Sequence, residues 1–319
     1  MKPPARLSLF VVALAALFGV AFAIGSASGL DLTPAPTPTH EAEGGHGDGS
    51  TDDDATETGH DDAETGHDDG GSHGDGSHAG ELPAGVLVSA DGYTLSDLAV
   101  PQAAGERGAI TFRILGPDGH AVTDYEAQHE KDLHLVVVSQ DTTEFFHEHP
   151  VMAADGTWSV DWTWPRAGSY RVYADVLPAG AEQGLTLAQD VTVPGDVVVE
   201  ALPEESRVAE VDGYTVSLTG DLTTSGGVLT LSVAHDGADV TDLDPYLGAY
   251  GHLVAIRVGD LAYLHVHPEG EVGTVPAGPD IEFSVAAPSP GTYRLFLDFS
   301  HGGEVRTAAF TVAVGAHEH

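Results

Sequence analysis

The sequence predicts an all-β protein: two tandem immunoglobulin-like antiparallel β-sandwich domains follow an N-terminal hydrophobic helix and a disordered His- and Asp-rich linker. From about Ala84 onward, short runs rich in β-branched residues, such as ITFRIL and LHLVVV, alternate with turn signals such as ADG and PDG. No long helical periodicity interrupts them. Many short strands at regular spacing are typical of a sandwich or barrel.

An internal duplication sets the number of domains. HLVVVSQDTTEFFHEHP, which starts at His134, aligns without gaps to HLVAIRVGDLAYLHVHP, which starts at His252. DGYTL matches DGYTV, and AGSYRVYADV matches PGTYRLFLDF. Each copy has roughly a hundred residues, the size of an immunoglobulin-like sandwich. We therefore expect domains at 84–196 and 205–315, with a C-terminal tail at 316–319.

The N-terminal residues 1–28 resemble an export signal or a membrane anchor. Lys2 and Arg6 precede the uncharged stretch Leu7–Ile24. This stretch is longer than a typical signal core of about 7–15 residues and close to the roughly 20 that span a bilayer. Cleaved signal and uncleaved anchor both remain open. Either way, we expect export, with the mature protein secreted or held at the extracytoplasmic face of the cell membrane by contact of this segment with the bilayer.

Residues 29–83 form a low-complexity linker of Gly, Asp, Glu, Ser, Pro and His. The segment contains too few apolar residues to build a core, so we expect it to be disordered. Two interpretations of its histidines remain open: a weak metal-collecting tail, or a solvated spacer. The histidines concerned are His40, His46, His60, His67, His73 and His78.

Charge and composition exclude several classes of function. The net charge of −39 argues against nucleic acid and anionic membrane surfaces as partners. The chain has no cysteine, which excludes disulfides, thiolate metal sites and a cysteine nucleophile. No spacing singles out a catalytic triad, and no phosphate-binding or dinucleotide-binding glycine motif is present. We expect the protein not to be an enzyme.

Histidines kept in both copies point to metal chemistry. In an extended strand, an H-x-H pair places both imidazoles on one face. A two-residue Gly259-Asp260 turn would pair Val254 with His265 and His252 with His267, bringing three imidazoles together at the open end of one hairpin. The ungapped alignment transfers this register to the first copy. The predicted metal ligands are His134, His147 and His149, and His252, His265 and His267.

Three converging imidazoles suit a copper or zinc ion. A Cu(I) site would need softer ligands, and Met152, the only methionine outside the N-terminal segment, has no counterpart in the second copy. The function expected is therefore a binding or carrier protein for divalent copper or zinc, with a membrane metal transporter as a candidate partner. The alternative is a structural or adhesive tandem module whose histidines hydrogen-bond to the backbone, because their face also carries Val136, Val138 and Phe145 and looks core-facing.

Other polar residues have weaker functional signals. Asp175 and Asp298 occupy matching positions, where a backbone N–H, Arg171 or Arg294 is the expected partner. Tyr170 and Tyr293 resemble a tyrosine-corner device. We expect exposed loops for the histidines without a counterpart in the other copy, His120, His129 and His301.

The histidine motifs resemble those of exported actinobacterial-type tandem proteins described as heavy-metal-binding or YtkA-like. The match is carried by 132–150 and 246–268, and the resemblance covers nearly everything after about Pro83. It implies a β-sandwich on the outer side of the membrane. A looser similarity is to CopC-type copper carriers, at the level of fold alone. The pair His265-Val266-His267 also resembles the H-V-H of Cu/Zn superoxide dismutases, a less favoured enzyme interpretation because that family's cysteines and downstream histidines are missing.

Overall fold

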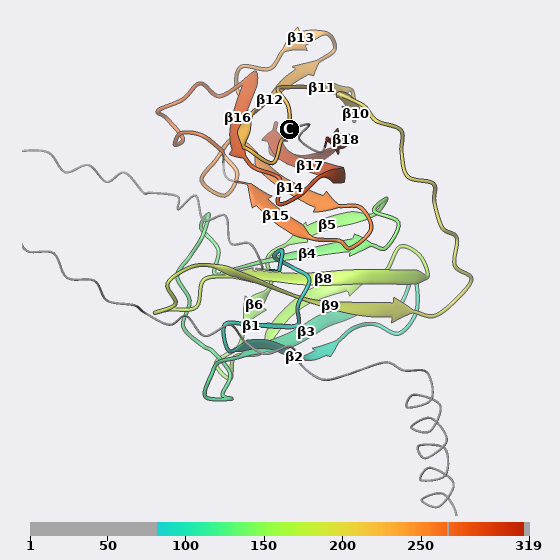
Figure 1. Ribbon diagram of the computed structural model, residues 1–319, viewed down its shortest axis with the longest axis vertical. Helices are drawn as coiled ribbons and strands as arrows, with labels where there is room; N and C mark the ends of the chain where they lie inside the picture. The colour runs from blue at the N-terminus through green and yellow to red at the C-terminus, as the bar shows by residue number, and fades with distance from the viewer. Residues whose placement is uncertain (1–81, 267, 316–319) are drawn as a thin grey trace, which may run out of the picture. The chain divides into compact units, whose positions relative to one another are not determined.

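The computed structural model describes residues 82–266 and 268–315 (Figure 1), and of His265 it describes the backbone alone. Every helix or strand in these residues is a β-strand, as predicted. None of them forms a helix long and apolar enough to cross a membrane. The predictions for residues 1–28, for the linker up to residue 81 and for 316–319 lie outside the described residues.

The first repeat, β1 to β9, is a two-layer sandwich in which all strand pairs are antiparallel. One sheet has the order β1-β2-β3-β7-β6: Ser89–Ala90, Tyr93–Ala99, Arg107–Leu115, Trp158–Thr163 and Val151–Met152. The other has the order β5-β4-β8-β9: Phe145–Glu148, Leu133–Ser139, Gly168–Val176 and Leu185–Val193.

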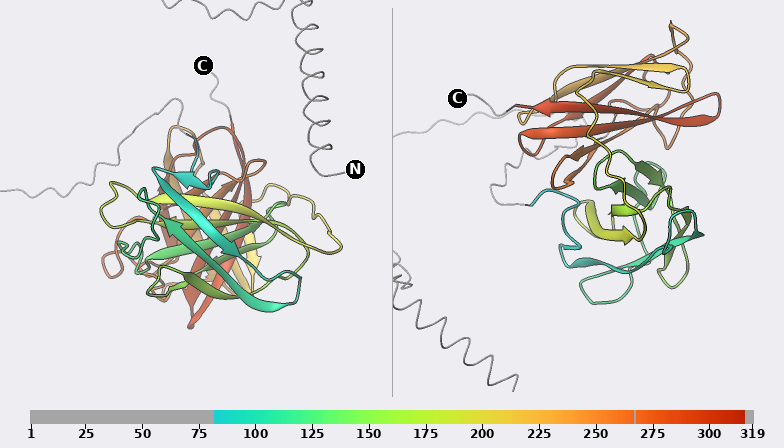
Figure 2. Two further views of the ribbon diagram at one scale, coloured as in Figure 1. Left: turned by 90° about the horizontal axis from the view of Figure 1, so that it is seen from below. Right: turned by 90° about the vertical axis from the view of Figure 1, so that its right-hand side faces the viewer.

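The second repeat, β10 to β18, repeats this plan (Figure 2). Its first sheet has the order β10-β11-β12-β13, with β16 also paired to β12: Val208–Val211, Tyr214–Thr219, Gly227–His235, Ala238–Asp239 and Asp280–Val285. Its second sheet has the order β15-β14-β17-β18: Tyr263–Val266, His252–Arg257, Gly291–His301 and Glu304–Val314. The fold class is therefore the predicted one: tandem immunoglobulin-like sandwiches.

Each repeat has its own hydrophobic core between its two sheets. Trp158, Trp162 and Trp164 lie in the first core, and the Trp164 indole N–H donates to the Pro101 carbonyl at 2.9 Å. Both predicted tyrosine corners are present: the Tyr170 hydroxyl donates to the Arg166 carbonyl at 3.0 Å, and Tyr293 to Ser289 at 2.8 Å. These bonds fix the start of β8 and of β17, the strands that flank the histidine-bearing β4 and β14.

Strand β4 is buried on both faces along its whole length. Leu135 and Val137 face the first core, whereas Val136 and Val138 belong to a third hydrophobic cluster. That cluster also contains Val254, Ile256 and other residues of the second repeat. The face that the sequence suggested to be core-facing is therefore covered by the other repeat. Sheet β5-β4-β8-β9 packs on sheet β15-β14-β17-β18, because both expose an apolar face that needs a partner.

The predicted hairpin register is confirmed where the structure describes it. Val254 pairs with His265, and the aligned Val136 pairs with His147. The predicted two-residue turn is wrong, because the observed connection is longer. A four-residue loop, 258–261, is closed by the Arg257 N–H donating to the Ala262 carbonyl at 2.9 Å, and Leu261 adopts a φ of 56°. The observed loop has one more residue on each side than the predicted turn, so the pairing of the two strands is still the predicted one.

Candidate metal centre

The three predicted histidines of the first repeat converge. His134 lies on β4, His147 on β5, and His149 follows β5 directly. His134 Nδ1 lies 3.0 Å from His147 Nε2 and 3.2 Å from His149 Nε2. One ring nitrogen from each residue falls within 4.8 Å of the other two. The period-2 geometry of the hairpin therefore brings together three imidazoles separated by as many as 15 positions in the chain.

Two of these imidazoles are held on their outer nitrogens by acceptor oxygens. His134 Nε2 lies 2.9 Å from the Gln128 carbonyl oxygen, to which it donates. His147 Nδ1 lies 2.9 Å from Asp298 Oδ2, and both side chains are at most 5% exposed. Asp298 belongs to β17 of the second repeat, 151 positions away. Donation on these sides turns His134 Nδ1 and His147 Nε2, with their lone pairs, toward the cluster.

The surroundings keep His149 neutral. Burial, together with the nearby His147, His134 and Lys131, lowers the pKa of His149 to about 3. Its imidazole therefore keeps a lone pair at neutral pH. Burial and the carboxylates of Asp298 and Glu148 raise the pKa of Tyr246 to about 12, so the phenol that lies edge-on to His149 stays protonated.

Two histidines extend the cluster toward the second repeat. The ring centroid of His252 lies 6.4 Å from that of His147 and 5.0 Å from that of His129. The sequence predicted an exposed loop for His129, and this is wrong: the residue is partly buried, 6.1 Å from His134. His129 and Glu130 form a tight turn with φ of 48° and 64°. This turn positions the Gln128 carbonyl that orients His134.

The second repeat contains the same arrangement at His252. This residue is fully buried, and its Nε2 donates to the Tyr246 carbonyl at 2.9 Å. Tyr246 precedes the turn Leu247-Gly248, the counterpart of His129-Glu130, with φ of 54° and 77°. The backbone of His265 lies opposite Val254. The side chain of His265 and the whole of His267 lie outside the described residues.

The expected arginine partners of the two matching aspartates are wrong. Arg171 pairs with Asp190, and Arg294 donates to Thr311, so neither arginine contacts the aspartate on its own strand. Asp298 instead accepts from His147 of the other repeat. The prediction for His301 is also wrong: it is partly buried, 2.7 Å from the Tyr214 hydroxyl. His120 is exposed, as expected.

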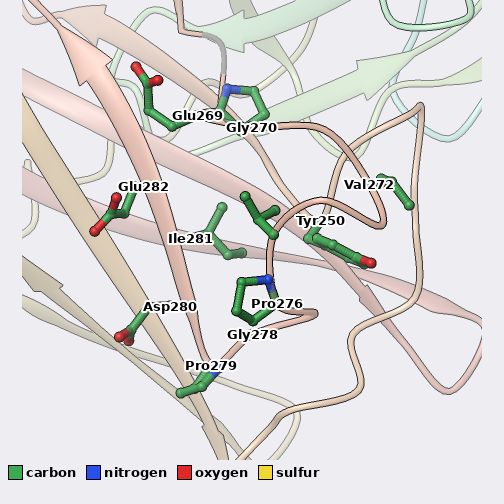
Figure 3. Close-up of a pocket in the computed structure, with 12 residues that line it drawn as sticks. Tyr250, Glu269, Gly270, Val272, Pro276, Gly278, Pro279, Asp280, Ile281 and Glu282 are labelled. Carbon is green, nitrogen blue, oxygen red and sulfur yellow. The ribbon is translucent and has the colours of Figure 1, made fainter.

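A cavity of about 400 Å³ lies beside β16 of the second repeat. Ile281, Tyr250, Val272 and Pro276 line it. Figure 3 shows the carboxylates of β16 on the side of the strand opposite to Ile281. Glu269, Asp280 and Glu282 also line the cavity, but among the described residues no set of polar groups converges in it, so its chemistry is that of a mainly apolar surface pocket.

The comparisons with known proteins identify a family but not an activity. A family model described as "Domain of unknown function (DUF8832)" matches residues 88–195 and again 209–316, which together make up more than half of the chain. The chain belongs to the DUF8832 family. The two family matches coincide with the two sandwiches. A relation of DUF8832 to the CopC or YtkA-like proteins stays a prediction.

No curated protein matches this DUF8832 chain. Among solved structures, it is similar to an Escherichia coli α2-macroglobulin activated by porcine elastase, with 13% identity over 70% of the chain and a TM-score of 0.25. The chain spans only 20% of that protein's length. A two-domain fibronectin type III segment of chicken tenascin matches with 10% identity and a TM-score of 0.19, covering 69% of this chain and 98% of the tenascin segment.

Proposed function

We propose that the protein is an extracytoplasmic binding or carrier protein for a divalent transition-metal ion, zinc or Cu²⁺. In the first repeat the ligands are His134, His147 and His149. In the second repeat the aligned His252, His265 and His267 are the proposed ligands, on the sequence match. The observation that carries the proposal is the convergence of three ring nitrogens in one partly buried, hydrogen-bonded cluster.

The hydrogen bonds around the cluster favour an ion at its centre. If His134 and His147 both donate outward, the inward lone pairs of His134 Nδ1 and His147 Nε2 meet at 3.0 Å, which is repulsive without a positive charge between them. A shared proton or a metal ion supplies that charge. Zn–N bonds of about 2.0–2.1 Å in a tetrahedral site place the ligand nitrogens roughly 3.3 Å apart, close to the spacing here.

The ligand types narrow the choice of ion. Neutral imidazoles without thiolates suit Zn²⁺ or Cu²⁺. Met152 packs against the core of the first repeat, so it offers no sulfur ligand to the cluster. Outer partners such as the Gln128 carbonyl and the Asp298 carboxylate are those that metal-bound histidines usually have, because they fix the tautomer and orientation of the ring.

The alternative function is a structural module of tandem sandwiches. The fold supports it, and the same hydrogen bonds could serve only to satisfy buried imidazoles. The two functions differ in what the loss of His149 does. A metal ligand is needed for binding, whereas a structural histidine contributes only to stability.

Calorimetric titration with Zn²⁺ and Cu²⁺ tests the proposal. The linker histidines should be replaced by alanine in the whole chain, so that they do not mask the folded sites. We expect binding at micromolar concentration or tighter, with affinity that falls below pH ~6.5 as protons compete for the imidazoles. His149→Ala should remove one bound ion, and the exposed His120→Ala should remove none. Absence of binding by the parent chain would leave the structural module as the function.

A further inference from the structure

The two repeats contact each other through equivalent residues. Arg171 of β8 donates to the carbonyl of Asp260, in the β14–β15 loop of the second repeat, at 2.6 Å. Its counterpart Arg294 of β17 donates to the carbonyl of Thr142, in the β4–β5 loop of the first repeat, at 3.3 Å. Thr142 and Asp260 are aligned residues. An arginine of each repeat therefore binds the hairpin loop of the other, as expected for two repeats related by a two-fold axis.

Aromatic pairs across the interface are also formed by equivalent residues of the two repeats. Tyr173 of the first repeat lies 5.1 Å from Tyr263 of the second, and their counterparts Phe296 and Phe145 stack at 4.2 Å. All of these rings belong to the hydrophobic cluster between the repeats or pack against it. The interface is therefore extended, buried and pseudo-symmetric, not a single contact point.

The two matching aspartates complete the pattern. Asp175 and Asp298 are 6% and 4% exposed, and each accepts a hydrogen bond from a threonine on the neighbouring strand, Thr186 and Thr307. Each also reaches across the interface to the other repeat. Asp298 Oδ2 lies 2.9 Å from His147 Nδ1, and Asp175 Oδ2 accepts from the Tyr263 hydroxyl at 3.3 Å.

We infer that Asp298 is a positioning residue for the metal site of the first repeat, so that the docked pair of repeats, and not the single sandwich, is the unit that binds the ion. This inference rests on the proposed function. The carboxylate holds the proton of His147 on Nδ1, directs Nε2 into the cluster and increases the basicity of that nitrogen. A sequence duplicated in tandem would otherwise be expected to contain two independent sites.

The placement of His252 also links the second repeat to the first-repeat site. Its ring lies beside both His129 and His147 of the first repeat. The turns that orient the first histidine of each repeat also lie close together. A Cβ placed on Gly248 would lie 3.8 Å from the Glu130 Cγ. The residues that orient the two histidine sets therefore lie along one seam between the repeats.

The test compares Asp298→Asn with Asp175→Asn in the whole chain, with the linker histidines and His267 replaced by alanine so that only the first-repeat site is counted. Both substitutions remove one charge from a buried, threonine-bonded aspartate. We expect Asp298→Asn to weaken Zn²⁺ binding by about 10- to 100-fold and Asp175→Asn to leave it nearly unchanged. Imidazole ¹⁵N NMR should show His147 protonated on Nδ1 in the parent chain and a mixture of tautomers in Asp298→Asn.

The outcomes separate the inference from the proposed function. If the parent chain binds neither Zn²⁺ nor Cu²⁺, the proposed function fails and takes the inference with it. If the parent chain binds and Asp298→Asn binds equally well, the inference alone is overturned. Should Asp298→Asn not fold, the parent chain still decides: a His147 protonated on Nε2 in the metal-loaded protein contradicts the positioning role.

Discussion

The two repeats share a plan but differ in what their common positions carry. At the interface the arginine, the aspartate and the first histidine are the same in both, whereas the aromatic pair is Tyr173 with Tyr263 on one side and Phe145 with Phe296 on the other. The interior differs more: tryptophans fill the first core, and the second contains none. The residues that the repeats have in common include those that join them and those that could hold an ion.

The largest expected effect is on the apolar half of the interface. Phe296 is 2% exposed and stacked on Phe145 across the repeats. Phe296→Ala should lower the free energy of unfolding by about 3–5 kcal/mol, because it leaves a cavity in a packed cluster. Urea unfolding measures this loss. The exposed Val305→Ala on the next strand is the control, expected to change stability by about 0.5 kcal/mol or less. Equal losses for the two variants would mean that the interface is not a packed core.

The tyrosine half of the interface should respond to loss of one oxygen. The Tyr173 hydroxyl donates to the Leu261 carbonyl at 2.7 Å, a buried contact between repeats that the Phe145–Phe296 pair lacks. Tyr173→Phe leaves that carbonyl without its donor and should cost about 1–3 kcal/mol. Thermal unfolding of the Tyr173→Phe variant, measured together with that of Phe145→Tyr, compares the tyrosine half of the interface with the phenylalanine half. A Tyr173→Phe variant as stable as the parent chain would show that water replaces the hydroxyl.

Acid should destabilise the metal-free protein through His149. Its folded pKa is lowered to about 3, below the unfolded value of ~6.5, so the unfolded chain binds more protons between these values. The stability contributed by neutral His149 is complete above pH ~6.5 and is lost as the pH falls toward 3. After discounting for partial exposure, we expect a loss on the order of 1 kcal/mol between pH 6.5 and 5.

The loss can be followed as a falling melting temperature in the presence of a chelator. His149→Gln should flatten the pH profile over this range. A profile that is equally steep in His149→Gln would assign the acid sensitivity to other groups.

The smallest expected effects concern the two turns. Glu130 has a φ of 64°, where its counterpart in the second repeat is Gly248. Glu130→Gly should stabilise the first repeat by a few tenths of a kcal/mol to about 1 kcal/mol, because glycine adopts this conformation without strain. Gly248→Glu should destabilise the second repeat for the same reason. Chemical unfolding of both variants checks the opposite signs, and changes of the same sign would contradict the equivalence of the turns.

Much of the fold was predictable because strands and turns are local. The Gly259-Asp260 turn and the ungapped alignment of the two copies were enough to give the hairpin register, which brought His134, His147 and His149 to one face. What covers that face was not predictable. Period-2 patterning shows that both sides of LHLVVV are apolar but does not distinguish an internal core from a second repeat.

The partners of the site histidines could not be predicted from the local sequence, for the same reason. Asp298 lies 151 positions from His147, and only tertiary packing brings them together. His129 was missed because the comparison of copies hid it: its counterpart, Leu247, has the same backbone conformation without the imidazole. A signal was present in the shared turn geometry, since both turns supply the carbonyl that orients the first histidine.

The most direct test of the account is the ligand shell of a bound ion. X-ray absorption of the chain with its linker histidines replaced, loaded with one equivalent of Zn²⁺, should show three imidazole nitrogens at about 2.0–2.1 Å, with the multiple scattering typical of imidazole. A shell made only of oxygens would contradict the account, because it would place the ion on surface carboxylates and leave the histidine cluster with a structural role.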